Sequence, residues 1–287
     1  MELISVVLVT YNRAHVLGKT IDSILNQTYS NFELLICDDY SPDHTQSVCL
    51  QYEDKDSRIR YFRNSKNLRM PNNLNLGISR SQGRYIANIH DGDIYAYTLL
   101  ERWKSALDAC PNAAFVFNSY CALDVDGNER IVYREPLNNC VTGSELLKKF
   151  FFARWRFDSP VWGTVMTRRC AYDTVGLFDE RFGFFADVDM WMRLAERYHV
   201  AYIDEPLIFL PSYDSLPRQF SVSFFKQQSI LEKMFWEARM RHYCRQPILQ
   251  LAEVSRHIAF VVVSRSWQLA LLARRKFLSW YTNTKTS

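Results

Sequence analysis

The sequence predicts an α/β domain built on a mostly parallel central sheet, followed by a helical C-terminal extension. Short apolar runs alternate with helical patterns from the first residues onward, as in repeated βαβ units. Most of these runs show little alternation of apolar and polar side chains, which is typical of strands buried on both faces of a parallel sheet. Hydrophobic residues make up 48% of the 287-residue chain, so a sizeable core can form.

The expected elements follow one another in a regular order. Four strands are expected at 4–10, 33–39, 58–64 and 85–90. The first is followed by a helix that carries Leu17, Ile21, Ile24 and Leu25, and the others by helices at 42–53, 71–81 and 99–110. Segment 113–135 is predicted to form two strands joined by a hairpin turn at Asp126 and Gly127. The remaining expected elements are a helix at 143–152, a strand at 161–167, a helix at 187–198 and a strand at 200–210.

The sequence also indicates where the domain ends and in which cellular compartment the protein is expected. We expect a domain over 1–220 and a helical basic extension over 221–287. The seven cysteines are scattered and form no C-x-x-C pair, which argues against a disulfide framework and a zinc site and favours a reducing cytoplasm. The N-terminus carries an acid and a short apolar run, so a first strand is expected there instead of a signal peptide.

Positive charge is concentrated at the C-terminus. Residues 241–287 carry eight Lys and Arg against one Glu, a net charge of +7, and the rest of the chain is net negative. Arginines interrupt the apolar stretches there, so no membrane span is expected. The extension is expected either to contact anionic lipid peripherally or to pack on the domain or on a second subunit. No nucleic-acid partner is expected.

Polar residues follow the first two strands where each is predicted to end. Thr10, Tyr11 and Arg13 offer a hydroxyl, an aromatic face and a cation just past the first strand. Asp38 or Asp39, past the second strand, could accept the imide N–H of uracil or thymine, or could cap the following helix. Because ligands bind beyond the carboxyl ends of parallel strands, these residues are expected at one binding edge.

The stretch NIHDGDIY (88–95) sets two carboxylates one residue apart directly after the fourth strand. Asp and Gly are ordinary turn residues, so a turn alone would explain Asp91 and Asp93. Two oxygen ligands held close together also suit Mg²⁺ or Mn²⁺, which can in turn hold phosphate oxygens. The position at the same sheet edge favours the cation site.

The chain resembles the family 2 glycosyltransferases, whose nucleotide-sugar-binding α/β fold is called GT-A. The resemblance rests on VVLVTYNRAHVLGKTIDSILNQTYSNFELLICDDYSPDHT (6–45), GISRSQGRYIANIHDGDIY (77–95) and VGLFDERFGFFADVDMWMRLAERYHVAYIDEPL (175–207). It implies inverting transfer of a sugar from a UDP or dTDP donor to a saccharide or lipid-linked acceptor in surface polysaccharide or glycan synthesis. A divalent cation, Mn²⁺ or Mg²⁺, is the implied cofactor.

The resemblance also implies roles for individual residues. Asp91 and Asp93 match a metal-binding D-x-D motif, and Asp39 matches the acid that contacts the base. Many relatives carry D-x-D-D at this place. When that motif is aligned with residues 90–93 without a gap, His90 and Gly92 stand where the relatives have acids, and only Asp93 matches an acid of the motif. The implied nucleotide pocket comprises Thr10, Tyr11, Arg13, Asp38, Asp39, Arg69 and Asp91.

The stretch ADVDMW (186–191) carries the implied chemistry. Relatives have a Glu-Asp pair here; Ala186 replaces the Glu, and Asp187 inherits the role of the general base that takes the acceptor's proton. Asp189 could share that role, or both acids could simply complement a helix N-terminus. The replaced acids leave open a degenerate, non-catalytic transferase-like binding or scaffold protein. Alternative bases are Asp158 and Asp179, and aromatic side chains that could stack on sugars or belong to the core are Trp162, Phe184, Phe185 and Trp191.

A nucleotidyltransferase that makes the activated sugar would share the α/β theme. Its glycine-rich phosphate loop has no counterpart in this sequence, which contains neither G-x-x-x-x-G-K nor G-x-G-x-x-G. The sequence therefore disfavours that class.

Overall fold

The structure is a computed structural model that describes residues 2–152, 159–161 and 163–211, with residues 230, 234, 237 and 238. The chain divides into two compact units, residues 1–231 and 232–287, and the second lies almost wholly outside the described residues. The expected boundary at 220 and the helical basic extension also fall outside them and stay predictions.

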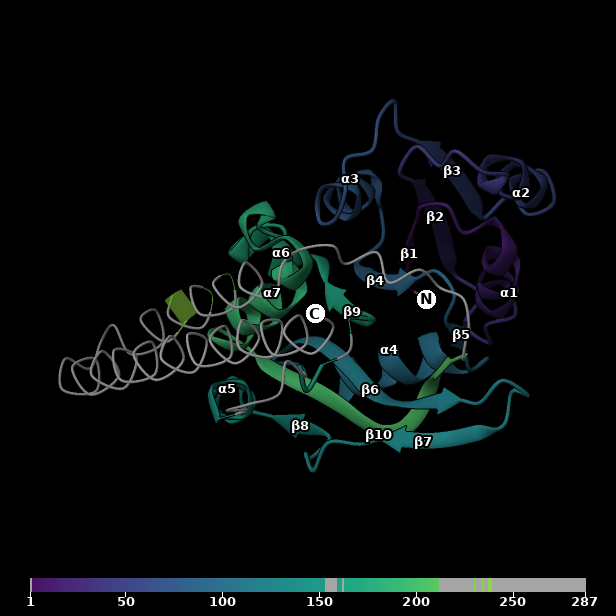
Figure 1. Ribbon diagram of the computed structural model, residues 1–287. Coiled ribbons are helices and arrows are strands. Elements are labelled where there is room, and N and C mark those ends of the chain that lie inside the picture. The colour runs from purple at the N-terminus through teal and green to yellow at the C-terminus, as the bar shows by residue number, and fades with distance from the viewer. Residues whose placement is uncertain are drawn as a thin grey trace, which may run out of the picture. The chain divides into compact units, whose positions relative to one another are not determined.

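One mixed sheet organises the described residues (Figure 1). The strand order is β3-β2-β1-β4-β9-β6-β10-β5, with β7 beside β6 and β8 beside β10. Neighbours from β3 to β4 are parallel, as are β6 and β10, whereas β9 runs antiparallel to both β4 and β6. The strands are β1 (Ile4–Thr10), β2 (Phe32–Asp38), β3 (Ile59–Arg63), β4 (Tyr85–His90), β5 (Ile94–Tyr95), β6 (Ala113–Leu123), β7 (Glu129–Tyr133), β8 (Cys140–Val141), β9 (Val165–Arg168) and β10 (His199–Leu210).

Helices cover both faces of the sheet. Apolar side chains of α1 and α4 join those of β1, β2 and β4 in one core cluster, whereas α3 packs on the other face of β1 and β2. Farther along the sheet, α7 packs against α5, α6 and β6. The helices are α1 (Ala14–Leu25), α2 (Thr45–Glu53), α3 (Asn72–Arg80), α4 (Leu99–Ala109), α5 (Gly143–Phe152), α6 (Arg169–Val175), the 3₁₀ helix η1 (Glu180–Phe185) and α7 (Ala186–Ala195).

The surroundings of strand β1 explain why its sequence is apolar at nearly every position. Ile4, Val6 and Leu8 face the cluster formed with α1 and α4, and Val7 faces Gly77 of α3. Both faces of the strand are therefore dry, so the usual alternation with polar residues is lost. The same burial on both faces holds for β2, whose seven residues are all buried.

The observed elements match most of the expected ones. The hairpin turn is confirmed, since β6 and β7 pair antiparallel and Gly127 adopts a positive φ of 86° between them. The strand expected at 161–167 begins only at Val165. The sequence analysis missed β5, β8, α6 and η1, which are two to seven residues long and too short to show a clear period.

The cysteines correct one expectation. Cys110, at the end of α4, and Cys140, on β8, form a disulfide with their Cα atoms 5.8 Å apart. They are 30 positions apart in the sequence, so a search for closely spaced pairs does not find them. The argument against a disulfide was therefore wrong for this pair, and cysteine spacing no longer supports a reducing compartment.

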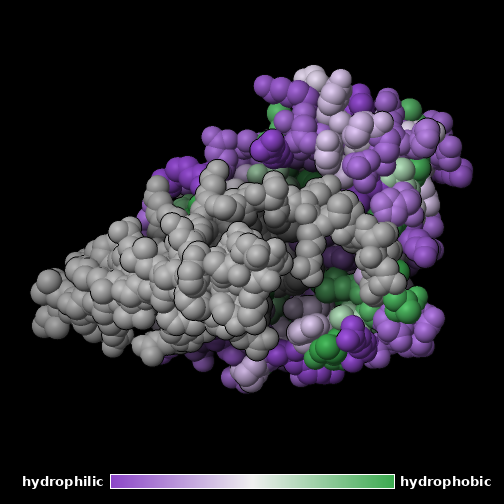
Figure 2. Space-filling model, in the orientation of Figure 1, coloured by the Kyte–Doolittle hydropathy of each residue, from purple (hydrophilic) through white to green (hydrophobic). Residues whose placement is uncertain are grey.

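The described surface is mainly hydrophilic in the view of Figure 2, with hydrophobic side chains at lower right, where β7 lies in Figure 1. Ile131 and Tyr133 on β7 and Val125 in the preceding turn are exposed. In the described part of the chain, no helix is both long and apolar enough to cross a bilayer.

The close contact of α3 with the sheet makes a testable prediction. A Cβ atom on Gly77 would lie 2.5 Å from Val7 Cγ1 and 2.8 Å from Cys37 Sγ, so we expect Gly77→Ala to lower the free energy of unfolding by about 1–3 kcal/mol. Gly18 of α1 is the matched control, because its nearest neighbour would be the Tyr52 hydroxyl at 3.3 Å. Gly18→Ala should change stability by less than about 1 kcal/mol. Equal urea midpoints for the two variants would contradict the tight packing of α3.

Candidate functional site

Three parallel strands end together at one edge of the sheet. In the pairing register, Thr10 of β1 lies opposite Asp38 of β2, and Val9 lies opposite His90 of β4. Hydrogen bonding between parallel strands fixes this alignment, so the loops that follow them emerge side by side. The structure thus brings together the residues around 10–13, 38–39 and 91–93, as expected.

The loop after β1 is anchored to the loop after β2. The backbone N–H groups of Asn12 and Arg13 donate to the Ser41 hydroxyl (2.9 Å) and the Thr45 hydroxyl (3.2 Å). The N–H of Ala14 donates to the Asp43 carboxylate at 3.1 Å. The bond from Ala14 satisfies the first amide of α1, which has no partner inside the helix, and together the three contacts fix where Arg13 leaves the backbone.

Backbone strain is concentrated at this edge. Among the described residues, the non-glycine residues with positive φ are Asn12 (58°), Tyr40 (67°) and Arg69 (61°). Asn12 and Tyr40 follow the ends of β1 and β2, and the N–H of Arg69 donates to Asp39. Left-handed backbone is costly for side chains larger than glycine and is retained where the surroundings impose it, often at binding sites.

Asp38 is fully buried and is used by its own loop. One carboxylate oxygen accepts from the Ser41 backbone N–H at 2.9 Å and the Ser41 hydroxyl at 2.5 Å. The other accepts from the Tyr61 hydroxyl at 2.7 Å and lies 3.5 Å from Arg63 Nε. These contacts support a loop-ordering role, and the nucleotide contact expected of Asp38 stays a prediction.

Asp39 holds the segment that carries Arg69. Its Oδ1 accepts from the Asn64 amide at 3.0 Å and the Leu68 N–H at 2.7 Å, and its Oδ2 accepts from the Arg69 N–H at 2.7 Å. Asp39 therefore holds the segment around residues 64–69 and does not cap α2, the helix that follows it in the sequence. The result places Arg69, an expected pocket residue, at the same edge as Arg13.

Asp91 faces the loop after β1. Arg13 Nε lies 3.8 Å from its Oδ1, and Thr10 and Tyr11 are among the neighbours that favour its charged form. Desolvation nevertheless raises the pKa of Asp91 above its ordinary value, against the lowering effect of these neighbours. The charge of this carboxylate is therefore incompletely compensated.

The D-G-D loop is also pinned to α1. The Thr20 hydroxyl donates to the Asp93 carbonyl oxygen at 2.8 Å and accepts from the Gly92 N–H at 3.0 Å. Gly92 has a φ of 89°, which a residue with a side chain rarely adopts. The loop is thus a tight turn as well as a candidate cation site, and it holds Asp93 in a buried position.

The two carboxylates fit a divalent cation. Their oxygens are the hard ligands that Mg²⁺ and Mn²⁺ prefer, and a cation would supply the charge compensation that Asp91 lacks. Within the described part of the chain, no third His, Cys, Asp or Glu ligand clusters with them. Further ligands would have to come from donor phosphates or water, as is common for Mg²⁺.

Asp187 lies beside the end of β4. A Cβ atom on Gly163 would lie 3.3 Å from Asp187 Oδ2 and 2.8 Å from His90 Nε2, so both side chains pack closely against this glycine. Desolvation raises the pKa of Asp187 to about 6, although its Oδ1 accepts a hydrogen bond from the Val188 N–H. Burial also lowers the pKa of His90 to about 4, so the imidazole is neutral at neutral pH.

Asp189 differs from Asp187 in its surroundings. It is buried and its Oδ2 accepts from Arg193 Nε at 2.7 Å, one helical turn later. Arg193 also donates to the carbonyl oxygens of Val175 and Leu177. Asp189 therefore ties α7 to the segment before η1, and this engagement favours a structural role over the catalytic one that we also expected.

The remaining candidate residues either have structural contacts or lie outside the described residues. Trp191 is fully buried against Phe115 and Phe178, and Phe185 is also buried, so packing accounts for both. Asp179 caps η1 and pairs with Arg181, which leaves it committed elsewhere. Trp162, Asp158 and the side chain of Phe184 lie outside the described residues.

Sequence reasoning missed Gly163 and Tyr95 as neighbours of the candidate base and the D-G-D loop, whereas it had singled out His90. His90 and Gly163 border Asp187, and the Tyr95 hydroxyl bonds to both the N–H and the carbonyl of His90 at 3.1 and 2.9 Å. His90 was visible in the sequence as a polar residue at the end of an apolar strand. Gly163 offered no such signal, because its proximity arises only when β9 pairs with β4.

Known proteins agree with this architecture. The family model described as "Glycosyl transferase family 2" matches residues 5–176. The chain is 31% identical over 148 residues to the Escherichia coli "UDP-Glc:alpha-D-GlcNAc-diphosphoundecaprenol beta-1,3-glucosyltransferase WfgD", covering 49% of this chain and 57% of that protein. It is 34% identical over 131 residues to the Campylobacter jejuni "GalNAc(5)-diNAcBac-PP-undecaprenol beta-1,3-glucosyltransferase", covering 45% of this chain and 41% of that one.

The fold has solved counterparts. The crystal structure of S. aureus TarS 1-349 in complex with UDP-GlcNAc superposes with a TM-score of 0.65 at 15% identity, covering 85% of this chain and 73% of that one. This likeness confirms the expected GT-A architecture, an α/β sheet flanked by helices. With the family match over more than half of its length, the chain belongs to glycosyltransferase family 2.

Proposed function

We propose that the chain is an inverting glycosyltransferase that moves a sugar from a nucleotide diphosphate donor to an acceptor hydroxyl. The observation that carries this proposal is the position and state of Asp187. It is a carboxyl group with a pKa raised to about 6, and it packs with His90 against Gly163, at the end of the strand that precedes the D-G-D loop. A general base works best when its pKa lies near the working pH.

The proposed chemistry follows from that carboxylate. Asp187 takes the proton of the acceptor hydroxyl while the oxygen attacks the anomeric carbon from the side opposite the departing diphosphate. Because His90 is neutral, it adds no positive charge that would lower the pKa of Asp187. Gly163 has no side chain, which lets both groups pack closely against it.

The donor side rests on the edge of β1, β2 and β4. Asp91 and Asp93 would hold the divalent cation, whose chemistry is to stabilise charge on the leaving diphosphate. In this proposal Arg13 and Arg69 would contact the diphosphate, while Thr10, Tyr11, Asp38 and Asp39 would contact the base and ribose. A uridine or thymidine diphosphate donor fits an acid that accepts an imide N–H.

The acceptor is proposed to be lipid-linked. The E. coli and C. jejuni relatives carry undecaprenol diphosphate acceptors in their names, and this chain spans only 57% and 41% of their lengths. The net charge of +7 over 241–287 supports peripheral contact with an anionic membrane, at a cytoplasmic face. A role in surface polysaccharide synthesis belongs to the same proposal.

The non-catalytic alternative rests on the sequence departures at His90, Gly92 and Ala186. A scaffold would bind a nucleotide sugar without hydrolysing or transferring it. Turnover of the donor by the purified chain therefore separates the two functions, and the variants below locate the groups responsible.

The cation site makes the first functional prediction. We expect Asp91→Asn and Asp93→Asn each to weaken Mn²⁺-dependent UDP binding, with the larger loss at Asp93, because a carboxamide is a poorer ligand for a hard cation. Asp126→Asn is the matched control, since Asp126 is exposed in the other Asp-Gly turn. Calorimetric titration with Mn²⁺ and with a chelator measures the effect. Unchanged Mn²⁺ dependence in both site variants would reduce the D-G-D to a turn.

The second functional prediction concerns Asp187, the proposed general base. Asp187→Asn keeps the size of the side chain but cannot accept a proton, so turnover should fall by roughly 10²–10⁴ while donor affinity stays near wild type. Asp189→Asn should chiefly weaken the contact with Arg193 and cost about 1–3 kcal/mol of stability. Single-turnover transfer rates and thermal unfolding of both variants test this. Full transfer by Asp187→Asn would remove the base from this position.

The third functional prediction concerns the pH dependence of sugar transfer. The base acts when deprotonated, so transfer should rise with pH through the pKa of about 6 and level off above it. Below that pKa, kcat/KM should fall about tenfold for each pH unit, and this acid limb should persist in Asp189→Asn but disappear from the residual activity of Asp187→Asn. An unchanged acid limb in Asp187→Asn would assign the titration to another group.

A further inference from the structure

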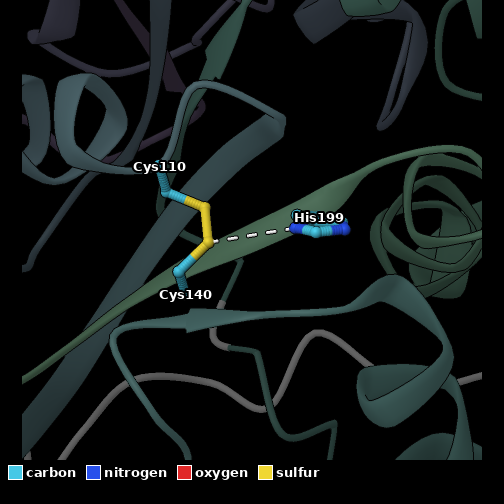
Figure 3. Close-up of side chains that lie close together, drawn as sticks. All are labelled: Cys110, Cys140 and His199. Carbon is cyan, nitrogen blue, oxygen red and sulfur yellow. Dashed lines mark hydrogen bonds between the residues drawn. A yellow bond between two sulfur atoms is a disulfide. The ribbon is translucent and has the colours of Figure 1, made fainter.

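A second group of chemically active side chains lies away from the sheet edge that carries the proposed active site. Cys110 ends α4, Cys140 lies on β8 and His199 begins β10 (Figure 3). The sulfur atoms and one imidazole nitrogen all lie within 4.8 Å of one another, and the Cys140 Sγ to His199 Nδ1 distance is 4.0 Å. None of the roles proposed above uses these residues.

Backbone hydrogen bonds hold the three positions together. The His199 N–H donates to the Asn112 carbonyl at 3.1 Å, two residues past Cys110, and the Cys110 N–H closes the last turn of α4. Cys140 lies on the strand paired with β10, opposite Ala201. The side chains therefore converge because of main-chain pairing and not only because of a bond between the sulfurs.

We propose that the reduced form of this group binds a soft divalent metal ion such as Zn²⁺ through Cys110, Cys140 and His199. Two thiolates and an imidazole are a ligand set that zinc takes in proteins. In the disulfide form the sulfurs are bonded to each other and cannot serve as thiolates. The disulfide and the metal site are then alternative states of one cluster.

The conversion between these states is balanced with a thiol or phosphine reductant. The reductant supplies two electrons, the Cys110–Cys140 bond breaks, and the sulfurs take up two protons. Zinc binding then releases those two protons as the thiolates coordinate the ion. A three-residue site leaves a coordination position for water.

Access to the cluster supports this assignment. A cavity of about 580 Å³ lies beside the two cysteines and is lined in part by Cys110, Cys140, Asn139 and Asp204. Cys140 is exposed, whereas Cys110 is buried at the back of the site. The cavity therefore offers both a route for the ion and room for a water ligand.

Cobalt is the probe that tests the proposal, because Co²⁺ bound by thiolates gives a charge-transfer absorption that oxygen ligands at the D-G-D loop do not give. The full chain is reduced with a phosphine, freed of reductant without air and titrated with Co²⁺ and then Zn²⁺. We expect one equivalent of thiolate-bound Co²⁺ that Zn²⁺ displaces. The oxidised chain should show no such absorption.

Variants assign the ligands. Cys140→Ser and Cys110→Ser should each lose the thiolate absorption, and Cys140 is exposed, so its substitution leaves the core undisturbed. His199→Ala should weaken binding by at least about tenfold, since losing even an outer-shell partner costs that much. Cys170→Ser is the matched control, because Cys170 is the exposed free cysteine of the described residues and should have no effect.

Three results would overturn the proposal. The first is a reduced chain that gives no thiolate-to-cobalt absorption. The second is Co²⁺ binding that is equal in the reduced and the oxidised chain. The third is binding that survives in Cys140→Ser with wild-type affinity. None of these readouts depends on sugar transfer, so the proposed function is tested separately.

Discussion

The alignment of β1 between two parallel partners is the constraint on which the candidate active site depends. Its residues pair with β2 on one side and β4 on the other, and the register sets Thr10 beside Asp38 and Val9 beside His90. A slip of one residue would turn Val7 away from Gly77 of α3 and toward the cluster formed with α1 and α4, so the different packing on the two faces disfavours it. Each strand end then delivers its polar residues to the same edge.

Buried and half-buried carboxylates at this edge fall into two groups. Asp38, Asp39 and Asp189 accept two or more hydrogen bonds or pair with an arginine, and these contacts order loops and helices. Asp187 and Asp91 are half-buried, and desolvation raises the pKa of both, although Asp187 accepts from the Val188 N–H and Arg13 lies 3.8 Å from Asp91. Burying a charge without full compensation costs free energy, and this cost is typical of groups kept for chemistry or ligand binding.

The sequence predicted the βαβ order and the candidate edge because those signals are local. Apolar runs, helical spacing and the polar residues after each strand are all visible within about ten positions. The short elements β5, β8 and η1 were missed because two to six residues give no measurable period. The pairing of Cys110 with Cys140 was missed because a 30-residue separation carries no local signature.

The sequence by itself determined the fold class, the strand ends and the candidates Asp91, Asp93, Asp187 and Asp189. Only the tertiary structure decided how these acids are surrounded, because His90 and Gly163 come beside Asp187, and Arg193 reaches the carbonyls of Val175 and Leu177, only after distant segments pack. Solvation and hydrogen bonding set a carboxyl group's pKa, and both are properties of the folded neighbourhood. The same physical reason applies to Cys110, Cys140 and His199, which three separate elements bring to one place.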